Sequence, residues 1–281
     1  MSTNMKVTVL IENTSPDNLI HEHGLSLLVE ENGKRILLDA GSTEAFTHNA
    51  ESIGISLHAL DACVLSHGHY DHSGGFAALF EANKEMSVYA LSNAVHPYFS
   101  GSGGIHEIGI PVNVLAHKDR FYFVDGLTEI FDGVYLVPHT TKGLEQIGRK
   151  SKLFMKEENT LVPDDFSHEQ SLVFDTNKGL IIFNSCSHGG VENIVKEAKT
   201  ACPHKPVYAY VGGLHMKGKA GGKDICTFSD EEIAALCGFI QKEKIRHVYT
   251  GHCTGLPGMQ KLRARLGDTV KAMTTGMCFE L

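Results

Sequence analysis

One segment says most about this chain: Leu65-Ser66-His67-Gly68-His69-Tyr70-Asp71-His72-Ser73-Gly74-Gly75. Three histidines and one aspartate fall within six consecutive positions of it, directly after an apolar run. On an extended backbone the side chains of His67 and His69 point the same way, because side chains alternate along a strand. Asp71 and His72 follow on a turning backbone and are expected to reach a second ion. We therefore predict a strand that ends in a metal-binding loop, with a helix beginning at Ser73.

The chemistry of these side chains favours divalent metals. Neutral imidazole and carboxylate groups suit zinc, manganese or iron(II). The alternative is a solvated polar turn that contains several histidines. Four potential ligands at the end of an apolar strand favour the metal site, because polar groups in such a position need partners.

The composition limits the class of protein. The chain has 281 residues, a formal net charge of -8 and 42% hydrophobic residues, which allows one large domain or two small ones. The acidic balance argues against a nucleic-acid partner, although a local basic patch can still bind a phosphorylated small molecule. No apolar run approaches a membrane span, so no membrane partner is expected. Seven scattered cysteines are typical of reduced thiols in the cytoplasm.

Apolar and alternating runs predict strands interleaved with helices. Strands are expected at 6–12, 25–30, 35–39, 62–66, 87–91, 111–115, 121–124, 134–138, 171–175, 179–184, 206–211, 245–250 and 269–274. Helices are expected at 43–53, 75–83, 190–200, 229–242 and 256–266. Each half contains a hairpin, a strand that ends in polar residues with histidine, and a helix. This repeat predicts an α/β protein with an αββα sandwich. We expect one domain over 1–281, with an excursion on its active face at about 92–170.

Two later strand ends carry further candidate ligands, and sites often gather at such ends. Cys186 and His188 follow one strand, and His252 follows another. We predict both histidines as metal ligands. Cys186 is either a third ligand or a small buried residue, and the second interpretation is the simpler one. His168 is likewise either a ligand or, more simply, a surface histidine.

A third strand end carries candidates for substrate binding. His215 is expected to support a ligand or to donate a proton to the substrate. The glycine-rich segment after it resembles a mobile lid that binds an anion, with a solvated loop as an equal alternative; its lysines are Lys217, Lys219 and Lys223. Thr254 and the helix start beyond it are also candidates for binding an anionic oxygen.

The motif His67-x-His69-x-Asp71-His72 resembles the signature of the metallo-β-lactamase superfamily, as does the early turn Leu37-Leu38-Asp39-Ala40-Gly41. The segments 184–194, 212–215 and 251–255 resemble one prokaryotic branch, described as metal-dependent hydrolases similar to 7,8-dihydropterin-6-yl-methyl-4-(β-D-ribofuranosyl)aminobenzene 5'-phosphate synthase. That resemblance implies a transferase that joins a pterin pyrophosphate to a phosphorylated arylamine. The chain departs from the superfamily pattern at Cys186, where a bridging aspartate is usual, and the third-ligand histidine has no unambiguous counterpart.

We predict two divalent metal ions, with zinc favoured over manganese or iron. The first ion would be held by His67, His69 and His188, and the second by Asp71, His72 and His252. Asp71 would also orient the nucleophile, His215 would act in catalysis, and Asp39 would fix the tautomer of a ligand imidazole.

The function predicted is a metal-dependent hydrolase that attacks a phosphorylated or other anionic small molecule through a metal-bound hydroxide. The pterin-dependent transferase and a non-catalytic metal- or ligand-binding sensor stay open as alternatives, since fold does not fix function. The segment 92–133 is either a contact of a homodimer or a wall of the substrate site.

Overall fold

The computed structural model describes residues 5–16 and 18–281. These residues divide into two compact units, each assembled from separate parts of the chain. The sequence predicts one domain. Unit 1 comprises Met1–Asp125, Lys142–Glu169 and Thr274–Leu281, and unit 2 comprises Gly126–Thr141 and Gln170–Met273. The expected excursion at 92–170 is therefore shared between the two units.

Unit 1 is built on a seven-stranded sheet with the order β20-β1-β2-β3-β4-β5-β8. Neighbouring strands are antiparallel from β20 to β3 and parallel from β3 to β8. The strands are β1 (Lys6–Ile11), β2 (Ser26–Glu31), β3 (Lys34–Leu38), β4 (Ala62–Val64), β5 (Val88–Leu91), β8 (Phe121–Val124) and β20 (Cys278–Glu280).

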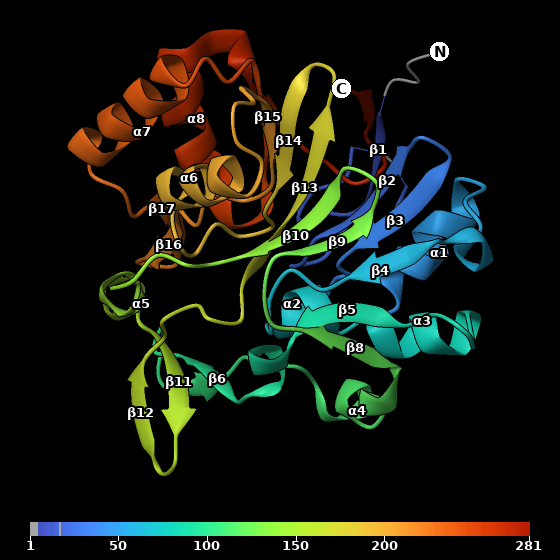
Figure 1. Ribbon diagram of the computed structural model, residues 1–281. Coiled ribbons are helices and arrows are strands. Elements are labelled where there is room, and N and C mark those ends of the chain that lie inside the picture. The colour runs from blue at the N-terminus through green and yellow to red at the C-terminus, as the bar shows by residue number, and fades with distance from the viewer. Residues whose placement is uncertain (1–4, 17) are drawn as a thin grey trace. The chain divides into compact units, whose positions relative to one another are not determined.

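Helices cover one face of this sheet (Figure 1). They are α1 (Ala45–Ser52), α3 (Phe76–Ala82) and α4 (Val112–Leu115). Phe46, Phe76 and Phe80 join a buried apolar cluster that also contains Leu37 and Val88 from the strands. Burial of this cluster fixes the positions of the parallel strands. The polar loops that follow their carboxyl ends therefore begin from fixed backbone positions.

A second, four-stranded sheet in unit 1 has the order β12-β11-β6-β7. It is formed by β6 (Tyr98–Ser100), β7 (His106–Glu107), β11 (Leu153–Glu157) and β12 (Thr160–Pro163), with α5 (Glu145–Ser151) preceding β11. Tyr98, Leu153 and Phe166 are buried together beside it. The sequence predicts irregular and polar segments here, because these strands are too short to show a clear alternation.

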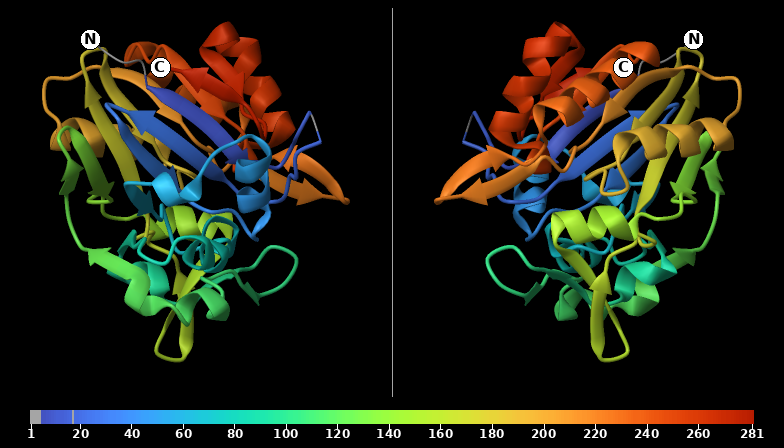
Figure 2. Two further views of the ribbon diagram at one scale, coloured as in Figure 1. Left: turned by 90° about the vertical axis from the view of Figure 1, so that its right-hand side faces the viewer. Right: turned by 90° about the vertical axis from the view of Figure 1, so that its left-hand side faces the viewer.

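Unit 2 contains a seven-stranded sheet with the order β19-β18-β15-β14-β13-β10-β9. Its strands are β9 (Thr128–Phe131), β10 (Val134–Pro138), β13 (Gln170–Thr176), β14 (Gly179–Phe183), β15 (Val207–Val211), β18 (His247–Thr250) and β19 (Val270–Ala272). The helices α6 (Val191–Ala201), α7 (Asp230–Lys242) and α8 (Gly255–Leu266) lie beside one another over this sheet (Figures 1 and 2). Ile182, Ile194 and Ile240 belong to the apolar cluster that joins the two layers.

The two sheets repeat one pattern of strand pairing. From β9 to β14 the pairs are antiparallel, and from β14 to β19 they are parallel, as in unit 1. One register row of unit 1 contains Leu38, Val64, Tyr89 and Tyr122, and the matching row of unit 2 contains Phe183, Val211, Tyr249 and Lys271. Just beyond these rows, Asp39 N–H donates to Val64 O at 2.9 Å and Asn184 N–H donates to Val211 O at 3.0 Å. The internal repeat expected from the sequence is present in the topology.

Two local predictions were wrong. Residues 111–115 do not form a strand: Pro111 precedes the short helix α4 with a φ of -59°. Proline favours a helix start because it fixes φ near the helical value and lacks an N–H group. The helix expected to begin at Ser73 begins instead at Tyr70, as α2 (Tyr70–Ser73), so that Asp71 and His72 are helical.

The helices of residues 5–16 and 18–281 are short: none combines the length and the apolar character that a membrane span needs.

A reciprocal capping box begins α7, and its loss should be measurable. Ser229 Oγ accepts from Glu232 N–H at 3.2 Å, and Glu232 Oε2 accepts from Ser229 N–H at 2.9 Å. We expect Ser229→Ala to lower the free energy of unfolding by about 1 kcal/mol, because the first turn loses a partner. Chemical denaturation measures this change. Ser229→Asp keeps an acceptor and is the control; an equal loss in both variants would contradict the prediction.

Candidate metal centre

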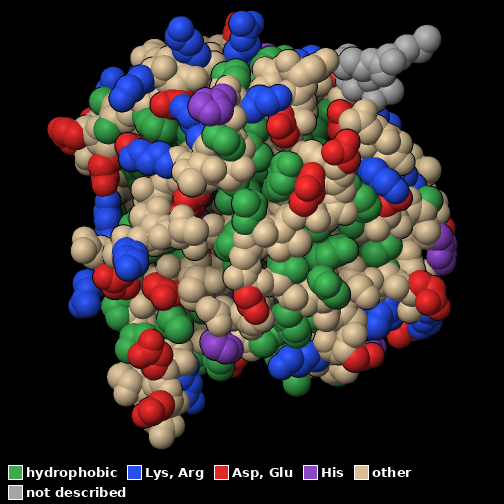
Figure 3. Space-filling view, viewed as in Figure 1, with side chains coloured by type: hydrophobic (Ala, Val, Ile, Leu, Met, Phe, Trp, Pro, Cys, Tyr) green, Lys and Arg blue, Asp and Glu red, His purple; other side chains and the backbone are tan. Residues whose placement is uncertain are grey.

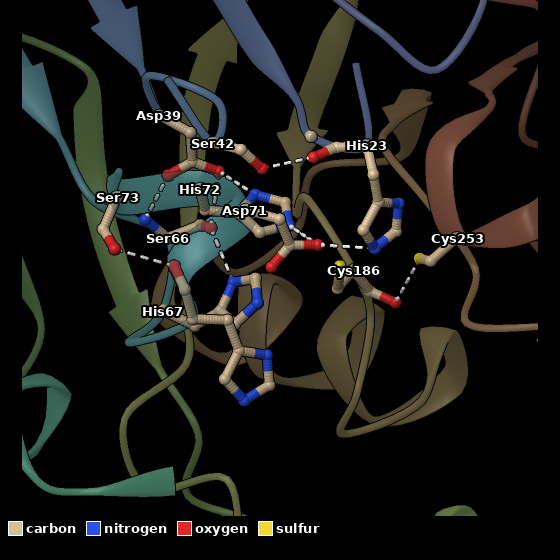
Figure 4. A network of polar contacts seen from close by, with 12 residues as sticks. His23, Asp39, Ser42, Ser66, His67, Asp71, His72, Ser73, Cys186 and Cys253 are labelled. Carbon is tan, nitrogen blue, oxygen red and sulfur yellow. Dashed lines mark hydrogen bonds and ion pairs between the residues drawn. The ribbon is translucent and has the colours of Figure 1, made fainter. Parts of the chain in front are cut away.

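Asp39 is the centre of a buried network in unit 1 (Figure 4). Ser66 donates its backbone N–H to Asp39 Oδ1 and its hydroxyl to Asp39 Oδ2, each at 2.7 Å. His72 Nδ1 lies 2.7 Å from Asp39 Oδ2. These three residues are fully buried. Asp39 has a φ of +60°, a left-handed conformation at the end of β3 that few side chains adopt, which marks this turn as constrained.

The network sets the tautomers of two imidazoles. A carboxylate only accepts hydrogen bonds, so the proton on His72 lies on Nδ1 and Nε2 keeps its lone pair. The Ser66 hydroxyl gives its proton to Asp39 and therefore accepts from His67 Nδ1–H, at 2.8 Å. His67 also keeps the lone pair of Nε2. The Asp39 carboxylate thus fixes the tautomers of two potential metal ligands, directly for His72 and through Ser66 for His67. Carboxylates that hydrogen-bond to metal-binding histidines have the same effect.

The other motif side chains gather at the same place. The ring centroid of His67 lies 4.5 Å from that of His69 and 4.2 Å from that of His72. Burial lowers the pKa of His69 to about 3, so this imidazole is neutral at pH 7. Asp71 Oδ2 lies 3.7 Å from His72 Nε2. Neutral imidazoles beside a carboxylate fit a divalent metal ion.

His23 is a contact that sequence reasoning did not include among the site residues. Its Nε2 lies 3.2 Å from Asp71 Oδ2, while about half of its side chain is exposed. His21 and His23 flank an early loop, so the sequence indicates that they could approach the site, but their spacing predicts no role for either.

His168 is not a surface residue. Its side chain is fully buried. Nδ1 accepts from Gly68 N–H at 2.9 Å, and Nε2 lies 3.0 Å from Asp164 Oδ2. With these partners one ring nitrogen accepts and the other donates. The surface interpretation of His168 is therefore wrong, while its role as a metal ligand stays a prediction, since donor atoms of His69, Asp164 and His168 lie within 4.8 Å of one another.

Unit 2 brings together the predicted ligand His252, the possible ligand Cys186 and Cys253, which was not predicted as a ligand. Donor atoms of Cys186, His252 and Cys253 lie within 4.8 Å of one another. Cys253 Sγ donates to Cys186 O at 3.6 Å (Figure 4). It also accepts from His215 N–H at 3.3 Å, so that Cys253 links three strand-end loops. The rings of His188 and His215 meet edge to face, with their centroids 4.3 Å apart.

The lysine segment of unit 2 is not a loop. It forms the antiparallel hairpin of β16 (Lys217–Ala220) and β17 (Lys223–Cys226). The two-residue turn uses Gly221 and Gly222 with φ values of 57° and 77°, as a type I′ turn requires. Lys217 Nζ lies 3.3 Å from Asp224 Oδ2, whereas Lys219 and Lys223 extend along the same hairpin.

Thr254 is fully buried, and its hydroxyl takes part in internal hydrogen bonds. Its Oγ1 accepts from Leu214 N–H at 2.9 Å and lies 2.6 Å from Thr250 Oγ1. These bonds join the loop after β15 to the start of α8. The anion-binding role expected for Thr254 stays a prediction.

Residues 21–147 match the family model described as the metallo-β-lactamase superfamily. A relative from Methanocaldococcus jannaschii, 7,8-dihydropterin-6-methyl-4-(beta-D-ribofuranosyl)-aminobenzene-5'-phosphate synthase, is 30% identical over 270 residues, which cover 90% of this chain and 88% of the relative. The chain belongs to the metallo-β-lactamase superfamily.

Solved structures of superfamily members agree with this assignment. Tm1679, a metal-dependent hydrolase of the β-lactamase superfamily, is 26% identical with a TM-score of 0.83, and the match covers 99% of both chains. Zinc-bound PqqB from Methylobacterium extorquens is 12% identical with a TM-score of 0.58, covering 98% of this chain and all of the other, and is similar in fold alone. The predicted metallo-β-lactamase type of α/β fold is confirmed.

Removing the charge of Asp39 should weaken metal binding. We expect Asp39→Asn to raise the zinc dissociation constant about 10- to 100-fold, because an amide no longer fixes both imidazole tautomers. Competition with a chromogenic chelator measures the constant. Asp61→Asn, at a carboxylate that pairs with Lys34 on the surface, is the control and should bind zinc as the wild type does.

Metal-free protein should lose stability as the pH falls from about 6.5 toward 3. The folded state lowers the pKa of His69 from 6.5 to about 3, so in this window the unfolded chain binds a proton that the folded imidazole does not. In this window the group makes the free energy of unfolding fall with each pH unit of acidification, by roughly 1 kcal/mol. Denaturation of wild type and His69→Ala at several pH values tests this. Equal slopes in the two proteins would contradict the prediction.

Proposed function

We propose that this chain is a metal-dependent hydrolase of an anionic small molecule. The observation that carries the proposal is the Asp39 network, which presents the Nε2 lone pairs of His67 and His72 from a fully buried position. Buried polar groups are costly unless they are satisfied, and a carboxylate–imidazole arrangement of this kind is typical of metal ligands. Membership of the metallo-β-lactamase superfamily supports the same interpretation.

We propose two divalent metal ions, with zinc favoured over manganese or iron(II). Unit 1 offers a set of nitrogen and oxygen donors: His67, His69, His72 and Asp71. Unit 2 offers nitrogen and sulfur donors: His188, His252 and Cys186. When bound, such ions supply Lewis acidity that polarises phosphate or ester oxygens. The assignment of particular donors to each ion stays the prediction made from the sequence.

The remaining steps are assigned to side chains. Asp71, beside His72 and His23, is proposed to orient the attacking water through its carboxylate. His215, which is partly exposed and in ring contact with His188, is proposed to donate a proton to the leaving group. The hairpin lysines would offset negative charge on the substrate; they are Lys217, Lys219 and Lys223.

A transferase reaction is the second candidate, and the name of the Methanocaldococcus relative favours it. In that reaction an arylamine would attack a pterin pyrophosphate, and pyrophosphate would leave as a C–N bond forms. The same positive charge and donor set serve either reaction, because the negative charge on phosphate oxygens must be offset in both. The identity of 30% supports a related substrate class without choosing between the two.

The proposed substrate is a small molecule rather than a nucleic acid. Figure 3 shows Lys and Arg side chains interspersed with Asp and Glu side chains on the face that it draws. A net charge of -8 is unfavourable for binding a polyanion. We also propose a cytoplasmic location, because the cysteines are free thiols and the cytoplasm keeps thiols reduced. A dimer contact in 92–133 stays a prediction.

Metal analysis of purified protein is the first test. We expect nearly two equivalents of metal in protein purified without chelator, measured by inductively coupled plasma mass spectrometry. His69→Ala and Asp71→Ala should each bind less metal, because each removes a donor group. His48→Ala is the control, since His48 is an exposed residue of α1. A wild type that binds no zinc, manganese or iron(II), even when these are added, would refute the proposal.

Product analysis then separates the two reactions. A hydrolase should release phosphate or alcohol from phosphoesters without an acceptor, whereas a transferase should release pyrophosphate from a pterin pyrophosphate only with an arylamine present. Tight binding of these compounds without turnover would favour a sensor over both enzymes.

A further inference from the structure

A histidine from far along the chain holds the backbone of the metal motif. Gly68, the residue between His67 and His69, donates its N–H to His168 Nδ1 at 2.9 Å across 100 positions of sequence. The bond is buried and lies within unit 1. Since Gly68 connects the two histidines, the orientation of its peptide group affects the direction in which both side chains point.

His168 is itself fixed by a carboxylate. Because Nδ1 accepts from Gly68, the ring proton lies on Nε2 and is donated to Asp164 Oδ2 at 3.0 Å. Both side chains are fully buried. Asp164 Oδ1 accepts from Phe166 N–H at 2.8 Å, which holds the carboxylate in turn. The pair therefore stabilises the one tautomer of His168 that can accept from Gly68.

The opposite side of Gly68 is equally constrained. A Cβ atom at Gly68 would lie 2.2 Å from Ala94 O, so the backbone at this position admits only glycine. The turn that contains Ala94 is tied to the same excursion as His168, because Asn93 Nδ2 donates to Ser167 Oγ at 3.0 Å. The Gly68 backbone thus lies between His168 and Ala94, and the segments that carry these two residues are hydrogen-bonded to each other.

An aromatic contact completes the support. The ring of Tyr98 stacks on His168 with centroids 3.8 Å apart and an interplanar angle of 25°. The Tyr98 hydroxyl donates to Asn93 O at 2.7 Å. This stacking leaves the imidazole of His168 no freedom to turn away from Gly68.

We propose that His168, held by Asp164, is a positioning residue that sets the Gly68 peptide and thereby the angle between the imidazoles of His67 and His69. The inference rests on the proposed metal site, and it gives the segment Lys142–Glu169 a role in metal affinity without contributing a ligand. Its loss should weaken metal binding in a protein that still folds.

Two isosteric variants test this inference. In His168→Asn the amide oxygen occupies the place of Nδ1 and can still accept from Gly68 N–H. In His168→Gln the amide reaches the place of Nε2, keeps the bond to Asp164 and leaves Gly68 N–H without its acceptor. We expect zinc affinity to fall about tenfold or more in His168→Gln and to stay within about threefold of wild type in His168→Asn. Chelator competition measures affinity, and thermal unfolding of the metal-free proteins checks folding.

Each outcome is informative. Equal losses in both variants would overturn the inference, because they would indicate a direct ligand or a general packing role. Wild-type affinity in a folded His168→Gln would overturn it as well, while leaving the proposed function intact. If neither variant folds, the Co(II) absorption spectrum and the Co(II) affinity of Tyr98→Leu are compared with those of the wild type. If both are unchanged, the inference is overturned. A wild type that binds no metal refutes the proposed function and this inference together.

Discussion

The carboxylate of Asp39, buried without contact to solvent, is the constraint on which the site in unit 1 depends. A buried negative charge is tolerated only when hydrogen bonds satisfy it, and here Ser66 and His72 supply them. These bonds require the ends of β3 and β4 to keep their register and Asp39 to keep its left-handed backbone. The fold and the chemistry are therefore linked at this residue: the same bonds that satisfy the carboxylate orient two imidazoles.

Local patterns were sufficient to predict the parts of the site that lie close together in sequence. The spacing of His67 and His69 predicts that their side chains point the same way, and their rings lie close together. His72, expected on the turning backbone beyond them, lies in α2 with its ring beside that of His67. The contact of His168 with Gly68 could not be predicted in this way, because the two residues lie 100 positions apart and only the folded excursion joins them. Burial and pairing of a histidine depend on tertiary contacts, which spacing does not encode.

Two other differences between the predicted and the observed structure have a signal in the sequence. Gly221-Gly222 between two polar runs is a signal for a two-residue hairpin turn, but the lysines beside it suggested a mobile loop. Pro111 likewise indicated a helix start, although the apolar residues after it were too few to distinguish a helix from a strand. The long helices were predicted well because they carry several periods of an apolar pattern, and the parallel strands because they are continuous apolar runs.

The pairing of β20 with β1 has a consequence for synthesis of the chain. Val9 N–H donates to Met277 O at 2.9 Å, and Glu12 N–H donates to Thr275 Oγ1 across 263 positions. The sheet of unit 1 therefore cannot be completed until Cys278–Glu280 has left the ribosome, after every residue of unit 2 has been made. Contacts of such high sequence separation are slow to form. Until they form, the edge of β1 has no partner strand and is open to chaperones or to other nascent chains.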